Sequence, residues 1–222
     1  MCHRSGFRIF LLIVLLNAVP AGGVAPFPDV TVRPAPVVAA PRTERYVIVS
    51  ADSQVIYRVG ETLFNENNRF NLAVGITQVV RGEIVVDRAN PPTSRIGTIS
   101  VDISQFRSDS SRRDQAIRQR WLESARYPIA EFTPTAIRGL PAAHVEGREV
   151  NVEITGNLKV REAVRRTTFA ATLKLEGDTL TGTATTQVLM TDFGFDPPAI
   201  FGILRAENEV RLEFRFTARR AP

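Results

Sequence analysis

The residues that could carry acid–base or nucleophilic chemistry are few and scattered in this sequence. Beyond residues 1–21, an expected signal peptide, His144 is the only histidine, and it falls in a segment rich in proline and alanine. With one imidazole and no cysteine other than Cys2, a histidine-based triad or a zinc site is not expected. Asp109 and Asp114 flank an expected helix start, where helix capping explains the two carboxylates better than catalysis does. We therefore expect a protein that is not an enzyme, holds no metal and needs no cofactor.

Arg112 and Arg113 are adjacent arginines that could bind a phosphate. They fall in the first turn of the expected helix, where the peptide dipoles favour anions. Planar guanidinium groups also match the oxygens of a lipid phosphate or diphosphate head group. The alternative is that both side chains only face solvent, and the sequence leaves both interpretations open.

The elements that must position these side chains show a period of two. Apolar and polar residues alternate in 70–77, 150–160 and 210–218, with shorter alternating runs between them. Such alternation is typical of strands with one buried and one wet face. Eight or more strands fit within about 175 residues, at a spacing typical of a sandwich or a barrel. The run 150–160 would extend about 37 Å, which favours a deep barrel.

One segment breaks the alternation. Ser111 to Asp114 resembles a capping box that opens a short helix, and Ile117 and Trp121 then share one helix face. The segment is too polar to be buried all round. We therefore expect an all-β fold, an antiparallel eight-stranded barrel with one short helix over an opening, and with Trp121 and Leu122 directed inward.

The first 45 residues have a different organisation. Residues 1–21 are interpreted as a signal peptide, because Arg4 and Arg8 precede or flank an apolar run that is too short to span a ~30 Å hydrocarbon core comfortably. Residues 22–45 form a Pro/Ala-rich stretch that is typical of an extended linker. The folded domain is expected over 46–222. A secreted or periplasmic location follows, with tethering by an uncleaved N-terminal segment as an open alternative.

The charge pattern gives no sign of nucleic-acid binding. The formal net charge is +5, and two of these positive charges belong to Arg4 and Arg8. The other arginines are interspersed with acids, which indicates a solvated mixed surface and not a basic stripe. We expect no nucleic-acid partner, and membrane contact only through the N-terminal signal segment.

Several short motifs follow one another in an informative order. They are SQVIYRV at 53–59, VGIT at 74–77, VRGEI at 80–84, ISVDISQFRSD at 99–109, RRD at 112–114, YPIAEF at 127–132, GNLKV at 156–160 and TDFG at 191–194. Their order and spacing resemble the YceI-like family of secreted or periplasmic lipocalin-like proteins, some of which bind polyisoprenoids. The resemblance extends from about residue 46 to 218. The RRD helix start followed by the YP-x-A-x-F segment is its most specific part.

Two departures from the family pattern stand out. The family often has a His-Ser pair in its first strand, where this chain has Asp52-Ser53. It also often has a Leu-Thr-Val-His-Gly-Val-Thr turn, where residues 158–164 read LKVREAV. The fold is expected to survive both changes, whereas any function that depends on those histidines is not.

The resemblance implies a lipocalin-like barrel that encloses a long-chain isoprenoid or other amphiphilic lipid. Strand aromatics are equally compatible with a filled core, and the resemblance favours a cavity. The expected function is extracytoplasmic binding, sequestration or transport of such a lipid. The alternative is a non-catalytic envelope or stress-associated interaction domain with a filled core. The expected ligand-binding residues are Phe70, Leu72, Val74, Val101, Trp121, Phe132, Leu158, Phe169, Phe193 and Phe214, with Arg112 and Arg113 at the head group.

Overall fold

The computed structural model describes residues 43–222. The predicted signal peptide, 1–21, and most of the predicted linker, 22–45, lie outside the described residues. The first strand, β1 (Thr43–Ile48), includes the last three residues of that linker. In the described part, no helix is long and apolar enough to cross a membrane.

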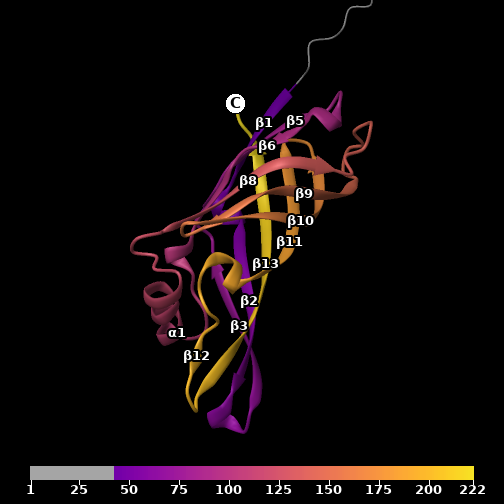
Figure 1. Cartoon of the computed structure of the whole chain (residues 1–222). Helices are drawn as coiled ribbons and strands as arrows, with labels where there is room; N and C mark the ends of the chain where they lie inside the picture. The colour runs from indigo at the N-terminus through magenta and orange to yellow at the C-terminus, as the bar shows by residue number, and fades with distance from the viewer. Residues whose placement is uncertain (1–42) are drawn as a thin grey trace, which may run out of the picture. The chain divides into compact units, whose positions relative to one another are not determined.

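Thirteen strands form one antiparallel sheet (Figure 1). Most of them pair in the order β4-β7-β8-β9-β10-β11-β13-β1-β5-β6, while β2 pairs with β13 and β3, and β12 with β13. After β1 the strands are β2 (Gln54–Leu63), β3 (Arg69–Thr77), β4 (Val80–Arg81), β5 (Glu83–Asp87), β6 (Arg95–Ile96), β7 (Ile99–Asp102), β8 (Ile129–Arg138), β9 (Glu149–Val160), β10 (Ala163–Glu176), β11 (Thr179–Leu189), β12 (Ala199–Ile200) and β13 (Leu204–Arg220).

The sheet curls back on itself because the chain links its two ends. β4 begins the pairing order and β5 lies near its other end, yet only Gly82 separates these two strands in the sequence. A single 3-10 turn, Ser50–Asp52, likewise separates β1 from β2, and both strands pair with β13. The expected all-β, lipocalin-like class is confirmed. The predicted number of strands, eight, is lower than the thirteen observed. Short interruptions such as Gly82 and the turn Ser50–Asp52 divide what would otherwise be longer strands.

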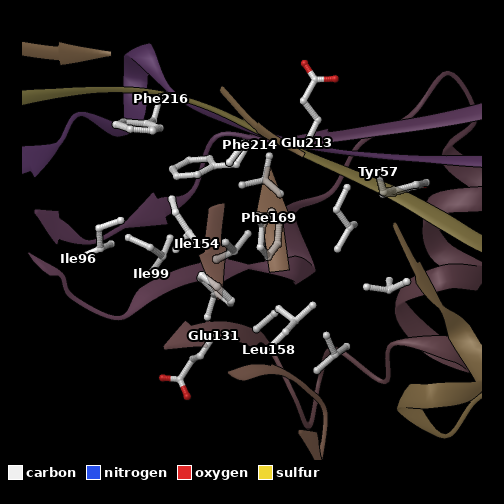
Figure 2. A pocket seen from close by; sticks show the side chains of 18 of the residues that line it. Tyr57, Ile96, Ile99, Glu131, Ile154, Leu158, Phe169, Glu213, Phe214 and Phe216 are labelled. Atoms are coloured by element: carbon white, nitrogen blue, oxygen red, sulfur yellow. The ribbon is translucent and has the colours of Figure 1, made fainter. Parts of the chain in front are cut away.

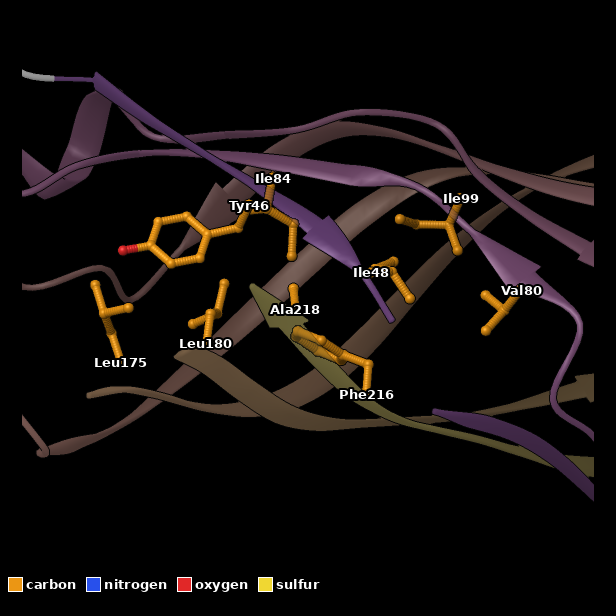
Figure 3. Packing of buried hydrophobic residues seen from close by; sticks show 9 residues of the cluster. All are labelled: Tyr46, Ile48, Val80, Ile84, Ile99, Leu175, Leu180, Phe216 and Ala218. Carbon is orange, nitrogen blue, oxygen red and sulfur yellow. The ribbon is translucent and has the colours of Figure 1, made fainter. Parts of the chain in front are cut away.

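Inward-facing side chains pack tightly at the end of the sheet formed by β1 and β5. Tyr46 and Ala218 are completely buried there, together with Ile84, Leu180 and Phe216. Figure 3 shows these side chains converging from four different strands. The alternation along β13 places Phe216 and Ala218 on the same inner face, as the sequence pattern predicts.

β3 has the opposite orientation to the predicted one. Phe70 is 62% exposed and Leu72 49%, and Val74 lies on the same outer face. The inner face of β3 carries small residues because the ring of Tyr57, on β2, lies over Gly75 and occupies the space. The prediction that Phe70, Leu72 and Val74 point into the barrel is therefore wrong. Alternation reveals that a strand has two faces, but a one-residue change of register exchanges them.

The N-cap of the helix α1 (Ser111–Ala116) lies one residue before the predicted capping box, which began at Ser111. Ser110 is its N-cap, and the Ser110 hydroxyl accepts a hydrogen bond from the backbone N–H of Arg113 at 3.3 Å. Asp114 does not reach back to a cap. Its buried carboxylate accepts hydrogen bonds from the backbone N–H of Ser108 at 3.0 Å and from the Ser108 hydroxyl at 2.6 Å. This pair ties the helix to the chain segment that precedes it.

Gly156 provides a test of the packing between β8 and β9. It lies where β8 has a bulge between Pro134 and Ala136. A Cβ atom at Gly156 would lie 2.5 Å from the carbonyl oxygen of Thr133 and 2.8 Å from the Cα of Pro134, and neither backbone atom can move freely. We expect Gly156→Ala to lower the free energy of unfolding by about 1–3 kcal/mol, measured by urea denaturation.

Gly97→Ala is the matched control for this substitution. The nearest atoms to a Cβ at Gly97 are the Cγ of Glu83 at 3.2 Å and the backbone oxygen of Glu83 at 3.3 Å, both farther away than the backbone atoms that face Gly156. We expect this variant to unfold close to the parent. Equal unfolding midpoints for the two variants would contradict the proposed steric role of Gly156.

Candidate ligand-binding cavity

The curled sheet and the helix segment enclose a cavity of about 320 Å³. This volume lies at the lower end of the range of about 300–1,000 Å³ found for small-molecule sites. In Figure 2, Ile154, Leu158 and Phe169 point into the space, whereas the carboxylates of Glu131 and Glu213 point away from it. The sheet therefore presents its apolar face to the cavity and its charged face to solvent.

Contacts between aromatic side chains brace the cavity wall. Phe132 on β8 meets Phe169 on β10 edge to face, with ring centroids 4.8 Å apart. Phe214 and Phe216 stack along β13 at 5.1 Å. Such aromatic pairs contribute about 0.5–1.5 kcal/mol beyond the burial of their area. They hold the wall in one shape, so the space between the walls is preformed.

The helix segment covers one end of the cavity. After α1 the chain continues in a π-helical turn, Ile117–Trp121, and Ile117, Trp121 and Leu122 all line the cavity. The predicted inward direction of Trp121 and Leu122 is confirmed. Arg161 holds the end of this turn by donating a hydrogen bond to the carbonyl of Trp121 at 3.3 Å.

The structure brings together seven of the ten apolar residues predicted to bind a ligand. The other three, Phe70, Leu72 and Val74, are not part of the cavity lining, because the register of β3 turns them outward. A ligand contact by any of the ten remains a prediction. The seven residues that line the cavity are Val101, Trp121, Phe132, Leu158, Phe169, Phe193 and Phe214.

The predicted head-group arginines have different positions. Arg112 is exposed and is not among the residues that line the cavity. Arg113 does line it, but its guanidinium is 3.2 Å from the Oε2 of Glu61 and also forms an ion pair with Asp109. The side chain of Glu61 is only 6% exposed and also accepts a hydrogen bond from Asn71 at 3.0 Å. The charge of Arg113 is therefore already compensated.

Sequence reasoning missed two polar residues of β2 that line the same end of the cavity. Tyr57 and Glu61 share the inner face with Val55 and Val59. The sequence did contain a sign of this arrangement. A glutamate at a position where the alternation predicts an inward-facing apolar residue indicates that its carboxylate has a partner inside the protein. The partner, Arg113, lies 52 residues away in the sequence and could not be inferred from the pattern.

Ion pairs also gather at the opposite end of the cavity. Arg88 donates to Glu44 and to Glu146, at 2.8 Å each, and to the hydroxyl of Tyr46 at 2.9 Å. His144 lines the cavity, and its Nε2 is 3.0 Å from the Oε2 of Glu146. Together with a backbone hydrogen bond, this contact holds the pKa of Glu146 at about 2.

The fold and the cavity define a class of protein, an antiparallel β-sheet curled around an apolar interior. Within that class the chain belongs to the YceI-like family, because the model of the YceI-like domain matches residues 46–218. No curated protein matches the chain.

Solved structures with this fold share little sequence identity with the chain. A polyisoprenoid binding domain from Saccharophagus degradans, implicated in plant cell wall breakdown, covers 81% of this chain and 100% of its own, at 11% identity and a TM-score of 0.59. BcnA of Burkholderia cenocepacia covers 77% and 98%, at 18% identity and a TM-score of 0.58. The YceI protein of Campylobacter jejuni covers 64% and 82%, at 14% identity and a TM-score of 0.51. At such identities the likeness shows the fold alone.

The ionisation of Tyr57 tests the environment of the cavity. Burial, followed by the nearby carboxylate of Asp114, raises the pKa of Tyr57 from 10 to about 12. The unfolded chain loses this proton first, so the stability that the neutral hydroxyl contributes is fully present below pH 10 and lost as the pH rises through 12. In a titration followed by tyrosinate absorbance, Tyr57→Phe should remove the step near pH 12. If the titration step that Tyr57→Phe removes lies near pH 10 instead, burial does not raise the pKa of Tyr57.

Proposed function

We propose that this protein binds a long apolar lipid, such as a polyisoprenoid, inside the cavity. The observation that carries the proposal is an apolar cavity lined from several strands and from the helix segment. Membership of the YceI-like family and the fold shared with a polyisoprenoid binding domain support the same ligand class. The alternative, an interaction domain with a filled core, requires side chains to occupy a space that remains free between them.

The proposed mechanism is sequestration. An apolar tail that leaves water for the cavity gains about 0.8 kcal/mol for each buried CH₂ group. The walls supply this gain without a catalytic group, a metal or a cofactor. The proposed place of action is outside the cytoplasm, and the signal-like features of residues 1–21 support it. Transport of the lipid between membranes is part of the same proposal.

Lipid extraction and a cavity-filling substitution test the proposal. Ala184 is buried, lines the cavity, and lies between Ala171 and Phe214 on neighbouring strands. We expect purified protein to release an isoprenoid-like amphiphile that mass spectrometry identifies. Ala184→Phe should lower the amount bound roughly tenfold, because overpacking opposes entry of the tail by about 1–3 kcal/mol.

Ala170→Phe is the matched control, since Ala170 is exposed on the outer face of the same sheet. It introduces the same ring without filling the cavity, so lipid binding should remain at the level of the parent. Thermal melting of both variants establishes that they fold. The proposal fails if the parent neither carries nor takes up any long-chain isoprenoid.

A further inference from the structure

An unpaired hydroxyl group faces the cavity at the end covered by the helix segment. Tyr57 is only 8% exposed and lines the cavity, but its hydroxyl makes no hydrogen bond to any atom of residues 43–222. Every fully enclosed polar side-chain atom in those residues has a partner, so this unpaired hydroxyl keeps some accessible surface. A polar group that lacks a protein partner and keeps accessible surface is normally paired with water. The Tyr57 hydroxyl is thus free to form a hydrogen bond with water or with a polar atom of a ligand.

The ring that carries this hydroxyl is held firmly. It packs edge to face against Phe106 with centroids 5.1 Å apart, and it lies over Gly75 of β3, where any larger residue would overlap it. Figure 2 shows Tyr57 on the other side of the cavity from Ile96 and Phe216. The hydroxyl is therefore a fixed polar point at one end of a long apolar space.

The charges around this point do not favour an anion. Beyond burial, the carboxylates of Asp114, Glu61 and Asp109 raise the pKa of the hydroxyl, whereas Arg113 lowers it. Arg113 is already paired with two of those carboxylates. Arg118 donates to a backbone carbonyl at 3.1 Å and is not among the residues that line the cavity. Negative charge thus exceeds available positive charge at this end.

We propose that Tyr57 anchors the head group of the bound lipid, and that this head group is an uncharged hydroxyl or carbonyl. The inference rests on the proposed function, because it concerns the same cavity. A neutral oxygen can accept a hydrogen bond from Tyr57 without burying a charge beside carboxylates. A phosphate would have to displace Glu61 from Arg113 and would meet the remaining acids. The anchor therefore differs from the arginine clamp that the sequence suggested.

Three probes with similar isoprenoid chains test this inference. They are geranylgeraniol, geranylgeranyl monophosphate and the hydrocarbon phytane, and Trp121, the only tryptophan, reports binding from the cavity wall. We expect geranylgeraniol to bind at least about tenfold more tightly than the monophosphate. Tyr57→Phe should weaken geranylgeraniol binding about three- to tenfold, the range expected for one lost hydrogen bond, and leave phytane binding unchanged.

Two further variants separate anchoring from a general structural effect. Tyr127→Phe removes a hydroxyl that donates to Glu162 at 2.6 Å and is not part of the cavity lining, so it should leave all three affinities unchanged. Glu61→Gln removes one carboxylate and should raise the affinity for the monophosphate. Thermal melts establish that each variant is folded.

The outcomes distinguish the two proposals. If no probe binds to the parent protein, the proposed function fails and the anchor fails with it. If the probes bind but Tyr57→Phe behaves like Tyr127→Phe, or if the monophosphate binds more tightly than the alcohol, the anchor alone is overturned. A selective loss of geranylgeraniol binding in Tyr57→Phe supports it.

Discussion

Because successive side chains of a strand point to opposite faces, every long strand of this sheet contributes one row of side chains to a common interior. Curling the sheet brings the rows of distant strands, such as those of β9 and β13, into the same enclosure. The rows pack fully where β1 and β5 approach β13, around Tyr46 and Ala218. Elsewhere they leave a gap that no side chain fills. The cavity is thus a direct result of strand geometry, and the helix segment, the ion pairs and the Tyr57 side chain are all arranged around it.

The sequence contained most of the architecture because alternation is a local signal. The strands, the short helix and the inward direction of Trp121 all followed from residues close in the chain. Two features could not be read in this way. The inner face of β3 depends on the bulk of Tyr57 on the neighbouring strand, and the state of Arg113 depends on Glu61, far away in the sequence. Both are contacts between elements that are separate in the sequence, for which a period of two gives no information.

The same reasoning explains why a family resemblance was visible although identity to the solved structures is only 11–18%. An alternating strand needs an apolar residue at every second position, and many residues satisfy that need. Positions with stricter demands are fewer. Gly156 is one of them, since the bulge in β8 brings backbone atoms against it. Two proteins can therefore share this fold although few of their residues are identical.

The ion pairs of Arg88 with Glu44 and Glu146 have a further consequence for the cavity. They connect β1, the end of β5 and the loop before β9, and so join three separate parts of the wall at one end. An apolar tail that reached this point would have to separate charges that compensate one another. These ion pairs would therefore limit how far the apolar tail of the proposed ligand extends into the cavity.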